Sequence, residues 1–489
     1  MSTGSGPVVP SAVTADHKAP PGERRMASPG WNLLSGVFGD PLMGQIFSET
    51  GTVASWLEVE RALATAQAQV GVISSDDAEA IARAAVLGSI DRDRLWEHTR
   101  NVGYPVLPLV HMLSAALPAG PNGRVHYGAT TQDIMDTALV LQLGRAMDRM
   151  EELLSSLGDL IADLVEQHVW TIMAARTHGQ QAVPTTFGAK LAVVLAECTR
   201  NRERLGQLRP RISKVSLFGA GGTSASLGTA ARSVRAAMAA ELGLGVDDVP
   251  WHVARDGLAE FAAVCALVSG TAGRLAREVI ELSRTEIREV AEAEGHLRGA
   301  SSTMPQKANP ISSEVIVGMS SLAGVLASAV FGAMRPTHER SAGDWQAEWQ
   351  AVPELAVLAG SSLHHAVDVV HGLRVFPGAM AANLAADGGL VIAEAYMMRL
   401  APLLGRDASH TLVYEASKEC RLSGETLFEV LRRKVPQDAA DAVRLLGKAI
   451  DAADYLGDVA VTCEVAVAQW RNLPTALQRA QAGTESDRP

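Results

Sequence analysis

Residues 133–164 read DIMDTALVLQLGRAMDRMEELLSSLGDLIADL, and this stretch constrains the fold more than any other. Apolar side chains recur in it at the period of an amphipathic helix rather than that of a strand. The positions that carry the period are Ile134, Ala138, Leu141, Met147, Met150, Leu154, Leu157, Ile161 and Leu164. A helix of about thirty residues far exceeds the globular average. The stretch therefore predicts an extended helix bundle, or a coiled-coil-like core shared between subunits.

The rest of the chain has the same character. Further long apolar stretches with helical spacing follow at 186–205, 258–290 and 312–334. Polar, glycine-rich loops separate these stretches at 174–184, 216–230 and 295–310. No stretch alternates in polarity convincingly enough to predict a sheet. We therefore expect an all-α protein.

The predicted organisation is a central bundle between two smaller helical regions. Residues 1–30 are rich in Ser, Gly, Pro and Ala without an uninterrupted apolar block, which indicates a flexible tail rather than a signal peptide. From about Phe376 onward the helical stretches shorten. The expected parts are the N-terminal tail (1–30), an N-terminal helical domain (31–125), a central long-helix bundle domain (126–372), a C-terminal helical domain (373–481) and a second tail (482–489).

The composition limits the kinds of partner and compartment. Of the 489 residues, 47% are hydrophobic and only 4% are aromatic, which favours helices packed closely through small side chains. The formal net charge of -11 argues against a nucleic acid or an anionic membrane surface as the main partner. The four cysteines lack the spacing of a metal site or of a disulfide framework, so we expect reduced thiols and a cytoplasmic protein.

Residues 315–334 contain no charged side chain over a length that would cross a bilayer. The segment nevertheless carries Gly318, Gly324 and Gly332, together with several serines, and lacks flanking aromatic anchors. A helix buried on all sides inside a bundle has the same composition. We therefore predict a packed helix and no membrane partner.

Two of the loops collect polar side chains beside helices. The first, His126-Tyr-Gly-Ala-Thr-Thr-Gln-Asp133, precedes the longest helix, whose N–H groups and dipole favour an anion. Simple capping by Thr131 or Asp133 would explain it equally well. The second, Ala175-Arg-Thr-His-Gly-Gln-Gln-Ala-Val-Pro184, flanks His178 with Arg, Thr and two amides. An acid or orienting group and a plain surface turn both remain open for that histidine.

The third loop, 295–310, reads Gly-His-Leu-Arg-Gly-Ala-Ser-Ser-Thr-Met-Pro-Gln-Lys-Ala-Asn-Pro. Its small and hydroxyl residues predict a mobile, hydrogen-bonding segment, and Lys307 and Asn309 add a cation and an amide. Asn309 could also be the N-cap of a helix that starts at Pro310. Capping explains Asn309 but not the rest of the string.

The string Ser301-Ser-Thr-Met-Pro-Gln-Lys-Ala-Asn-Pro310 resembles the signature loop of the fumarase/aspartase superfamily, which includes adenylosuccinate lyase, argininosuccinate lyase and 3-carboxy-cis,cis-muconate cycloisomerase. The other two loops resemble the superfamily's remaining motifs, in the same order. Phe38-Gly-Asp-Pro41 and His338-Glu-Arg-Ser-Ala-Gly343 most resemble the cycloisomerase branch. The resemblance implies an all-helical fold of three regions and a homotetramer around shared long helices, with each active site built from three subunits.

The resemblance also implies roles for individual residues. Ser302 matches a serine that, as an alkoxide, removes a proton from the carbon next to a carboxylate, and His178 is the candidate acid or orienting group. Lys307 and closure of the loop could stabilise the oxyanion. The residues expected to hold the substrate are Arg100, Asn101, Thr130, Thr131, Gln132, Thr177, Gln180, Lys307, Asn309 and Arg340. No metal or cofactor is expected, because no step needs a Lewis acid or an electron sink.

Departures from the superfamily pattern bear on the substrate. Gln306 and Ala308 stand where His and Arg are common, and Gln181 replaces a frequent His. A tricarboxylate or a nucleotide phosphate would need that charge, because desolvating an unpaired anion is costly. We therefore expect β-elimination from a succinate-type dicarboxylate to give fumarate, with nitrosuccinate, which releases nitrous acid, as the best candidate.

Three alternatives stay open. The flanking sequence favours 3-carboxy-cis,cis-muconate cycloisomerase activity. A C–N lyase similar to adenylosuccinate lyase and a catalytically silent structural homologue are the others. The joint presence of Ser302, Lys307, Asn309, Thr177 and His178 argues against the silent homologue.

Overall fold

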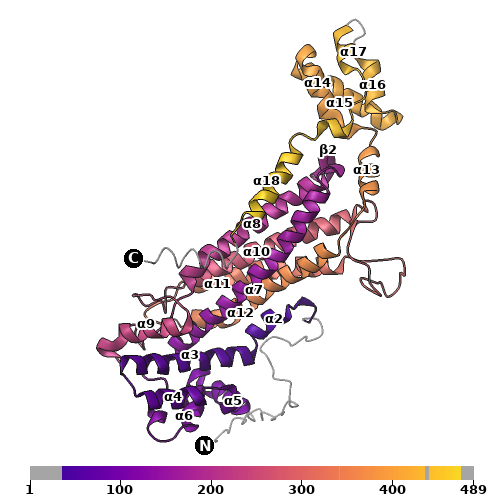
Figure 1. Ribbon diagram of the computed structural model, residues 1–489. Coiled ribbons are helices and arrows are strands. Elements are labelled where there is room, and N and C mark those ends of the chain that lie inside the picture. The colour runs from indigo at the N-terminus through magenta and orange to yellow at the C-terminus, as the bar shows by residue number, and fades with distance from the viewer. Residues whose placement is uncertain (1–35, 341, 436–439, 475–489) are drawn as a thin grey trace, which may run out of the picture.

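A computed structural model describes residues 36–340, 342–435 and 440–474. The predicted tails at 1–30 and 482–489 lie outside the described residues. The molecule is elongated, with long helices through its middle and smaller helical groups toward both ends (Figure 1). The all-α class predicted from the sequence is confirmed.

Long helices build the middle of the molecule. The stretch quoted above folds as α7 (Thr131–Gln167), whose 37 residues confirm the predicted long helix. The helices that pack with it are α8 (Phe187–Ile212), α10 (Asp256–Leu282), α11 (Ile311–Ala333) and α12 (Asp344–His371). Their buried faces share one hydrophobic cluster, because apolar residues at helical spacing turn a single stripe toward the neighbouring helices.

The sequence patterns do not predict α12. Pro353 lies inside this helix, and a proline removes a backbone hydrogen bond and normally breaks or kinks a helix. Burial of Val352, Leu355 and Leu363, each fully inaccessible, offsets that cost. Packing on α10 and α11, rather than local preference, therefore makes this segment helical.

The prediction of a chain without sheets is wrong at two places. The 174–184 segment, expected to be a loop, belongs to an antiparallel hairpin of β1 (Ile172–Thr177) and β2 (Gln180–Thr186), and β3 (Val290–Ala291) pairs with β4 (Arg374–Val375). In the hairpin turn, His178 and Gly179 have φ values of 51° and 76°, as a type I′ turn requires. His-Gly is not a common signal for that turn, so the sequence alone does not reveal it.

The smaller helical groups lie toward the two ends of the bundle (Figure 1). The N-terminal part contains α2 (Pro41–Ile46), α3 (Glu49–Val70), α4 (Ser75–Ala84), α5 (Arg92–Val102) and α6 (Val106–Ala115), with α9 (Ala231–Leu242) packed on α3. The other end contains α13 (Pro377–Ala385), α14 (Ala393–Leu404), α15 (Arg406–Ser423), α16 (Leu427–Lys434) and α17 (Ala440–Leu446). Single-turn 3-10 helices are η1 (Gly36–Phe38), η2 (Leu87–Ser89), η3 (Pro121–Arg124), η4 (Gly228–Ala230), η5 (Leu390–Ile392) and η6 (Ala452–Tyr455).

The final helix, α18 (Val459–Arg471), returns from the C-terminal group and packs on the bundle (Figure 1). Trp470 on α18 covers Gly158 of α7, where a Cβ atom would stand 2.1 Å from the indole ring. The Trp470 indole N–H also donates to Asp159 at 2.7 Å. A glycine on α7 thus lets α18 pack closely on the central core.

Two of the described helices, α10 and α11, are long and apolar enough to cross a membrane by length and composition alone. The most apolar window of α10 is 67% buried inside the chain, but that of α11 is only 28% buried. Leu322, Val325 and Phe331 on α11 are 50%, 67% and 48% exposed. A single chain therefore does not bury α11 on all sides, and its apolar face is available to another surface.

Candidate active site

The first candidate loop ends at the start of α7. Thr130 is the N-cap of this helix, and its N–H donates to the Asp133 carboxylate at 3.0 Å, which confirms capping by Asp133. Arg340 reaches the same point from the segment before α12. Its Nε donates to Gln132 Oε1 at 3.0 Å and its Nη2 donates to Thr130 Oγ1 at 3.4 Å. The structure thus brings together Thr130, Gln132 and Arg340, with the partly exposed Thr131 as first helical residue.

We call Thr130, Thr131, Gln132 and Arg340 the Thr130 strip. A buried ion cluster supports this strip from within the bundle. Gln132 Nε2 donates to Asp136 at 3.1 Å, and Asp136 pairs with Arg255 at 2.7 Å. Arg255 also pairs with Glu348 at 2.5 Å. Burial raises the pKa of Glu348, and the Arg255 charge opposes that rise. Loss of any one member would leave a buried charge without its partner, so the cluster is held together as a unit. Gln132 is bonded to Asp136, and the cluster therefore fixes its position.

His126, the first residue of the same motif, forms an ion pair that its sequence neighbourhood does not predict. Its Nδ1 lies 2.6 Å from Oε1 of Glu60 on α3, and Glu60 is only 1% exposed. Burial lowers the pKa of the imidazole, but the charge and hydrogen bond of Glu60, together with the charge of Asp133, outweigh burial and raise the pKa of His126 above its usual 6.5. The sequence shows His126 in the motif, but its partner Glu60 lies 66 residues earlier, so no local pattern predicts the pair.

The His126–Glu60 pair should stabilise the fold most at low pH. Because the folded pKa of His126 is raised, its contribution is complete below about pH 6.5 and is lost as the pH rises through the folded pKa. His126→Asn removes the charge, and Asn tolerates the left-handed backbone at this position, where φ is 60°. Urea unfolding should therefore show a larger destabilisation at about pH 6 than at about pH 9. A destabilisation independent of pH would show that the pair is not ionic.

Thr177, His178 and Gln180 lie at the exposed tip of the β1–β2 hairpin. Thr177 pairs with Gln180 across the His178–Gly179 turn, so the tip presents these side chains to the surroundings. Gln181, by contrast, donates from Nε2 to the carbonyl of Asn383 on α13 at 3.0 Å. Gln181, which stands where the superfamily often has His, therefore anchors the hairpin to α13. Its neutral side chain adds no charge to the site.

The 295–310 loop forms a closed hoop before α11. At its neck, Ala300 and Ala308 form an antiparallel bridge. Asn309 donates to the Gly299 carbonyl from both its backbone N–H and its Nδ2, each at 2.9 Å. Ser302 and Lys307 are exposed in the hoop between these neck residues. The loop thus holds the candidate base and a cation within six residues of each other, outside the packed interior.

The N-terminus of α11 is not capped by Asn309. The helix begins at Ile311, one residue later than Pro310, and the buried carboxylate of Glu292 accepts from the Ser313 N–H at 2.8 Å and from the Ser313 hydroxyl at 2.7 Å. A carboxylate is favourable there, because the first turn has unpaired N–H groups and the positive end of the dipole. The Asn309 amide closes the hoop instead, and its Nδ2 uses one of its two N–H groups on the Gly299 carbonyl, which leaves the second for a substrate carboxylate.

Arg100 and Asn101 are exposed near the end of α5, in the N-terminal group (Figure 1). Within the part of the chain that the structure describes, no hydrogen bond or ion pair joins either residue to another candidate residue. Their role in substrate binding stays a prediction.

In one chain the first loop lies far from the other two. The Thr130 strip and the hairpin flank opposite ends of α7, whose 37 residues span about 55 Å. Ser302 precedes the start of α11, whereas Arg340, beside Thr130, follows its other end, and the 23 residues of this helix span about 35 Å. The candidate loops therefore cannot surround one small substrate unless different chains supply them.

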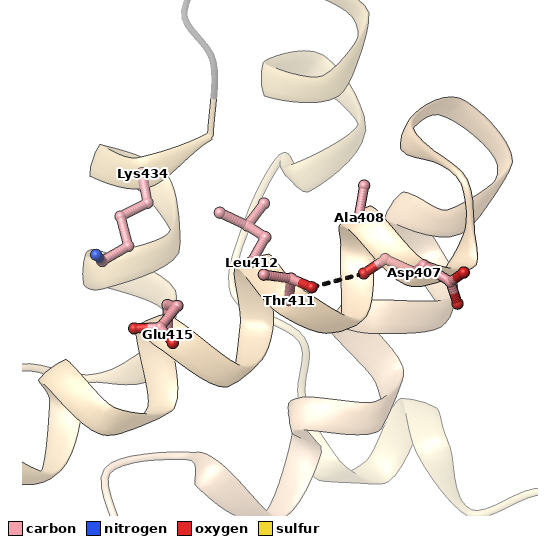
Figure 2. Close-up of a pocket in the computed structure, with 6 residues that line it drawn as sticks. All are labelled: Asp407, Ala408, Thr411, Leu412, Glu415 and Lys434. Carbon is pink, nitrogen blue, oxygen red and sulfur yellow. Dashed lines mark hydrogen bonds between the residues drawn. The ribbon is translucent and has the colours of Figure 1, made fainter.

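A pocket of about 600 Å³ lies on the C-terminal group (Figure 2). Its lining residues are Asp407, Ala408, Thr411, Leu412, Glu415 and Lys434. These side chains come from α15 and α16, and the Thr411 hydroxyl donates to the Asp407 carbonyl at 2.9 Å. None of the residues predicted to act on substrate belongs to this pocket. Over 36–340, 342–435 and 440–474, no group of three or more His, Cys, Asp or Glu side chains is arranged to hold a metal ion.

The sequence model of a protein family described as Lyase matches residues 37–323. The 3-carboxy-cis,cis-muconate cycloisomerase of Pseudomonas aeruginosa is 41% identical over 90% of this chain and 97% of its own length. The chain belongs to the fumarase/aspartase superfamily of lyases. It is an enzyme of that superfamily, as predicted from the signature loop.

Two further members of the superfamily are informative. The N-acetyl-S-(2-succino)cysteine lyase of Dickeya dadantii is 36% identical over 79% of this chain and 85% of its own length. The crystal structure of the 3-carboxy-cis,cis-muconate lactonizing enzyme from Pseudomonas putida superposes with a TM-score of 0.81 at 36% identity, covering 90% of this chain and 99% of that one. Similar identities thus accompany relatives with different named reactions, so overall similarity does not determine the substrate.

Proposed function

We propose that this lyase eliminates a substituent from a 2-substituted succinate and releases fumarate. Ser302 carries the proposal, because it is exposed in a hoop that also presents Lys307 and is closed at its neck. In the proposed reaction the Ser302 alkoxide takes a proton from the carbon next to one carboxylate. The electron pair of that C–H bond forms the new double bond, and the substituent on the neighbouring carbon leaves with its bonding pair.

A serine hydroxyl is a weak base in water, so the site must stabilise its anion. Closure of the hoop over the substrate would exclude water, and the Lys307 ammonium would then favour the alkoxide more strongly than it does in solvent. The carbanion that forms places charge on the adjacent carboxylate. Thr130, Thr131 and Arg340 at the start of α7 are suited to hold that carboxylate, since helix N–H groups and a guanidinium both favour anions.

The charges of the site favour a dicarboxylate with a small leaving group. At the hoop and beside Thr130, Lys307 and Arg340 match two carboxylates, whereas the exposed Gln306 and Ala308 of the hoop are neutral. Arg100 is the further cation among the candidate residues, and no hydrogen bond or ion pair within the described residues joins it to either of these points. Nitrosuccinate fits these charges, since nitrite leaves as a stable anion and needs no strong acid. We propose it as the leading substrate, giving fumarate and nitrous acid.

A substrate panel tests this choice directly. The purified chain should release nitrite and fumarate in equal amounts from nitrosuccinate. 3-Carboxy-cis,cis-muconate and N-acetyl-S-(2-succino)cysteine, the substrates that the relatives' names indicate, are the comparison arms. Absence of nitrite together with rapid turnover of either comparison substrate would reject nitrosuccinate.

The second candidate function is 3-carboxy-cis,cis-muconate cycloisomerase. The 41% identity over 90% of the chain to the Pseudomonas aeruginosa enzyme of that name favours it. Against it stands the extra carboxylate of that substrate, for which the hoop offers Gln306 and Ala308 rather than a cation. Lactone formation in the substrate panel would establish this alternative.

We also propose that the working form is a homotetramer in the cytoplasm without a membrane partner. The exposed apolar face of α11, which includes Leu322, Val325 and Phe331, would pack against long helices of other copies. A shared bundle would also bring hoop, hairpin and strip from different chains together. The four cysteines are free and buried, which suits a reducing compartment.

Mixing two inactive variants should restore activity if chains share active sites. Ser302→Ala removes the proposed base, and His178→Ala removes the group proposed to orient the substrate, so a tetramer of either variant alone is expected to be nearly inactive. After co-refolding at equal ratio, about one quarter of the sites should combine an intact serine with an intact histidine. Turnover should recover to roughly that fraction of wild type. No recovery, despite mixed tetramers in native mass spectra, would mean that one chain supplies both groups.

A further inference from the structure

A buried carboxylate fastens the hairpin that carries Thr177 and His178. Arg176 on β1 makes a bidentate pair with Glu289, from Nη1 to Oε2 at 2.9 Å and from Nη2 to Oε1 at 2.7 Å. The side chain of Glu289 is 0% exposed and that of Arg176 is 18% exposed. A planar bidentate pair fixes direction as well as distance, so it sets the orientation of the residue next to Thr177.

The opposite strand of the hairpin is held through the same carboxylate. Gln181 on β2 is paired with Arg176 across the hairpin and donates to the Asn383 carbonyl on α13 at 3.0 Å. Asn383 in turn donates from Nδ2 to Glu289 Oε1 at 2.9 Å. Arg176, Glu289, Asn383 and Gln181 thus form a closed ring at the base of the Thr177–Gln180 turn.

A second carboxylate, three residues after Glu289, fastens the signature loop. Glu292 accepts from the N–H and the hydroxyl of Ser313 in the first turn of α11, at 2.8 and 2.7 Å. It also lies 3.8 Å from Arg298 inside the loop. Residues three apart in an extended strand point to opposite sides. One side chain therefore faces the hairpin and the other faces the hoop.

The strand between these carboxylates is itself held in place. Val290 and Ala291 form β3, which pairs with β4. The Phe376 N–H donates to the Glu289 carbonyl at 2.9 Å, and Arg374 Nε donates to the Glu292 carbonyl at 3.2 Å. Glu289–Glu292 is therefore a fixed support with a loop fastened to each side.

We propose that Glu289–Glu292 is a shared anchor in which Glu289 positions the Thr177–His178 turn and Glu292 positions the Ser302 loop. Both are positioning residues, since each acts through the loop that it holds. The inference rests on the proposed function in assigning Thr177, His178 and Ser302 to the substrate. It matters for rate because a reacting group displaced by about 1 Å can cost on the order of 100-fold.

Local hydrogen exchange in two variants of the full chain tests the anchor. Glu289→Gln keeps the side-chain size and removes the charge, and it should speed amide exchange at 177–181 at least tenfold while leaving 299–309 unchanged. Glu292→Gln should show the reverse pattern. Each variant should also lower kcat/KM for the best substrate by roughly tenfold or more. Unchanged exchange in both loops would overturn the anchor.

A matched control separates positioning from general loss of stability. Asp40 is also buried and pairs with Arg149 at 2.8 Å, but that pair joins the start of α2 to the middle of α7 and, within the described residues, makes no hydrogen bond or ion pair with the three loops. Asp40→Asn should lower Tm about as much as Glu289→Gln and leave kcat/KM within about threefold of wild type. If it lowers kcat/KM as much as Glu289→Gln does, the activity loss is a stability effect and the positioning role is wrong.

A double variant covers the case in which Glu289→Gln fails to fold. Arg176→Met with Glu289→Leu removes both charges, so no buried charge is left unpaired. Tm should recover, whereas fast exchange at 177–181 and low kcat/KM should persist. Full activity in this variant would contradict the proposal. The exchange measurement needs no substrate, so a wrong substrate assignment would not affect the proposed anchor. Exchange at 177–181 and 299–309 that stays as slow as in the wild type in both variants would reject the anchor for any substrate.

Discussion

Replacing Ser302 with alanine should lower turnover at least ~100-fold and leave the fold intact. The side chain is exposed in the hoop, so its loss removes no buried contact. If the hydroxyl is the base, the variant keeps substrate binding through Thr130, Arg340 and Lys307 but has no group to take the proton. KM should therefore change far less than kcat. Fumarate release measures the rate, and thermal unfolding checks the fold.

Ser301→Ala is the matched control for this experiment. The Ser301 hydroxyl accepts from the Met304 N–H at 3.1 Å, so its role in the structure is to shape the hoop. The same hydroxyl also contacts the N–H and the hydroxyl of Thr303 at 3.3 and 3.4 Å. Surface hydrogen bonds of this kind contribute about 1 kcal/mol each at most, and turnover should fall by less than about tenfold. Near-normal turnover in Ser302→Ala, or a larger loss in Ser301→Ala, would remove Ser302 from the role of base.

Local patterns predict much of the fold and of the site. The period of Ile134 to Leu164 predicts α7 because a helix can form one apolar stripe from nearby residues alone. The Ser301–Pro310 string predicts the superfamily, because the residues of this loop alone resemble the signature loop, whatever the rest of the chain contributes. Tertiary contacts override local preference elsewhere. Pro353 lies inside α12, a helix that no sequence pattern predicts, and the His178–Gly179 turn depends on its anchored strands.

The supports of the site cannot be predicted in this way, because they join residues that are distant in the chain. Arg340 meets Gln132 across 208 positions, and Arg176 meets Glu289 across 113. A charged residue in a sequence does not reveal whether it will be buried with a partner or exposed to solvent. The sequence is also ambiguous at short range. The position of Asn309 is equally compatible with capping α11 and with closing the hoop, and only the structure shows which of the two occurs.

Gly299→Ala should lower turnover by about 100-fold, because it opens the neck of the hoop. Gly299 has a φ of 66°, and an added Cβ would lie 2.3 Å from the carbonyl oxygen of Asn309. The atom that it meets belongs to the backbone, so the neck has to separate. Separation would break the two hydrogen bonds from Asn309 to Gly299 and displace Ser302 relative to α11. Single-turnover measurements should place the loss in the chemical step.

Gly295→Ala supplies the comparison within the same loop. A Cβ at Gly295 would lie 3.4 Å from Arg298, and that side chain can shift slightly, so turnover should stay within about threefold of wild type. Gly299→Ala should at the same time keep the wild-type Tm to within a few degrees, since the hoop is exposed and contributes little to the core. Wild-type turnover in Gly299→Ala would mean that the closed neck is not needed. The base would then have to be held in place by groups outside the hoop.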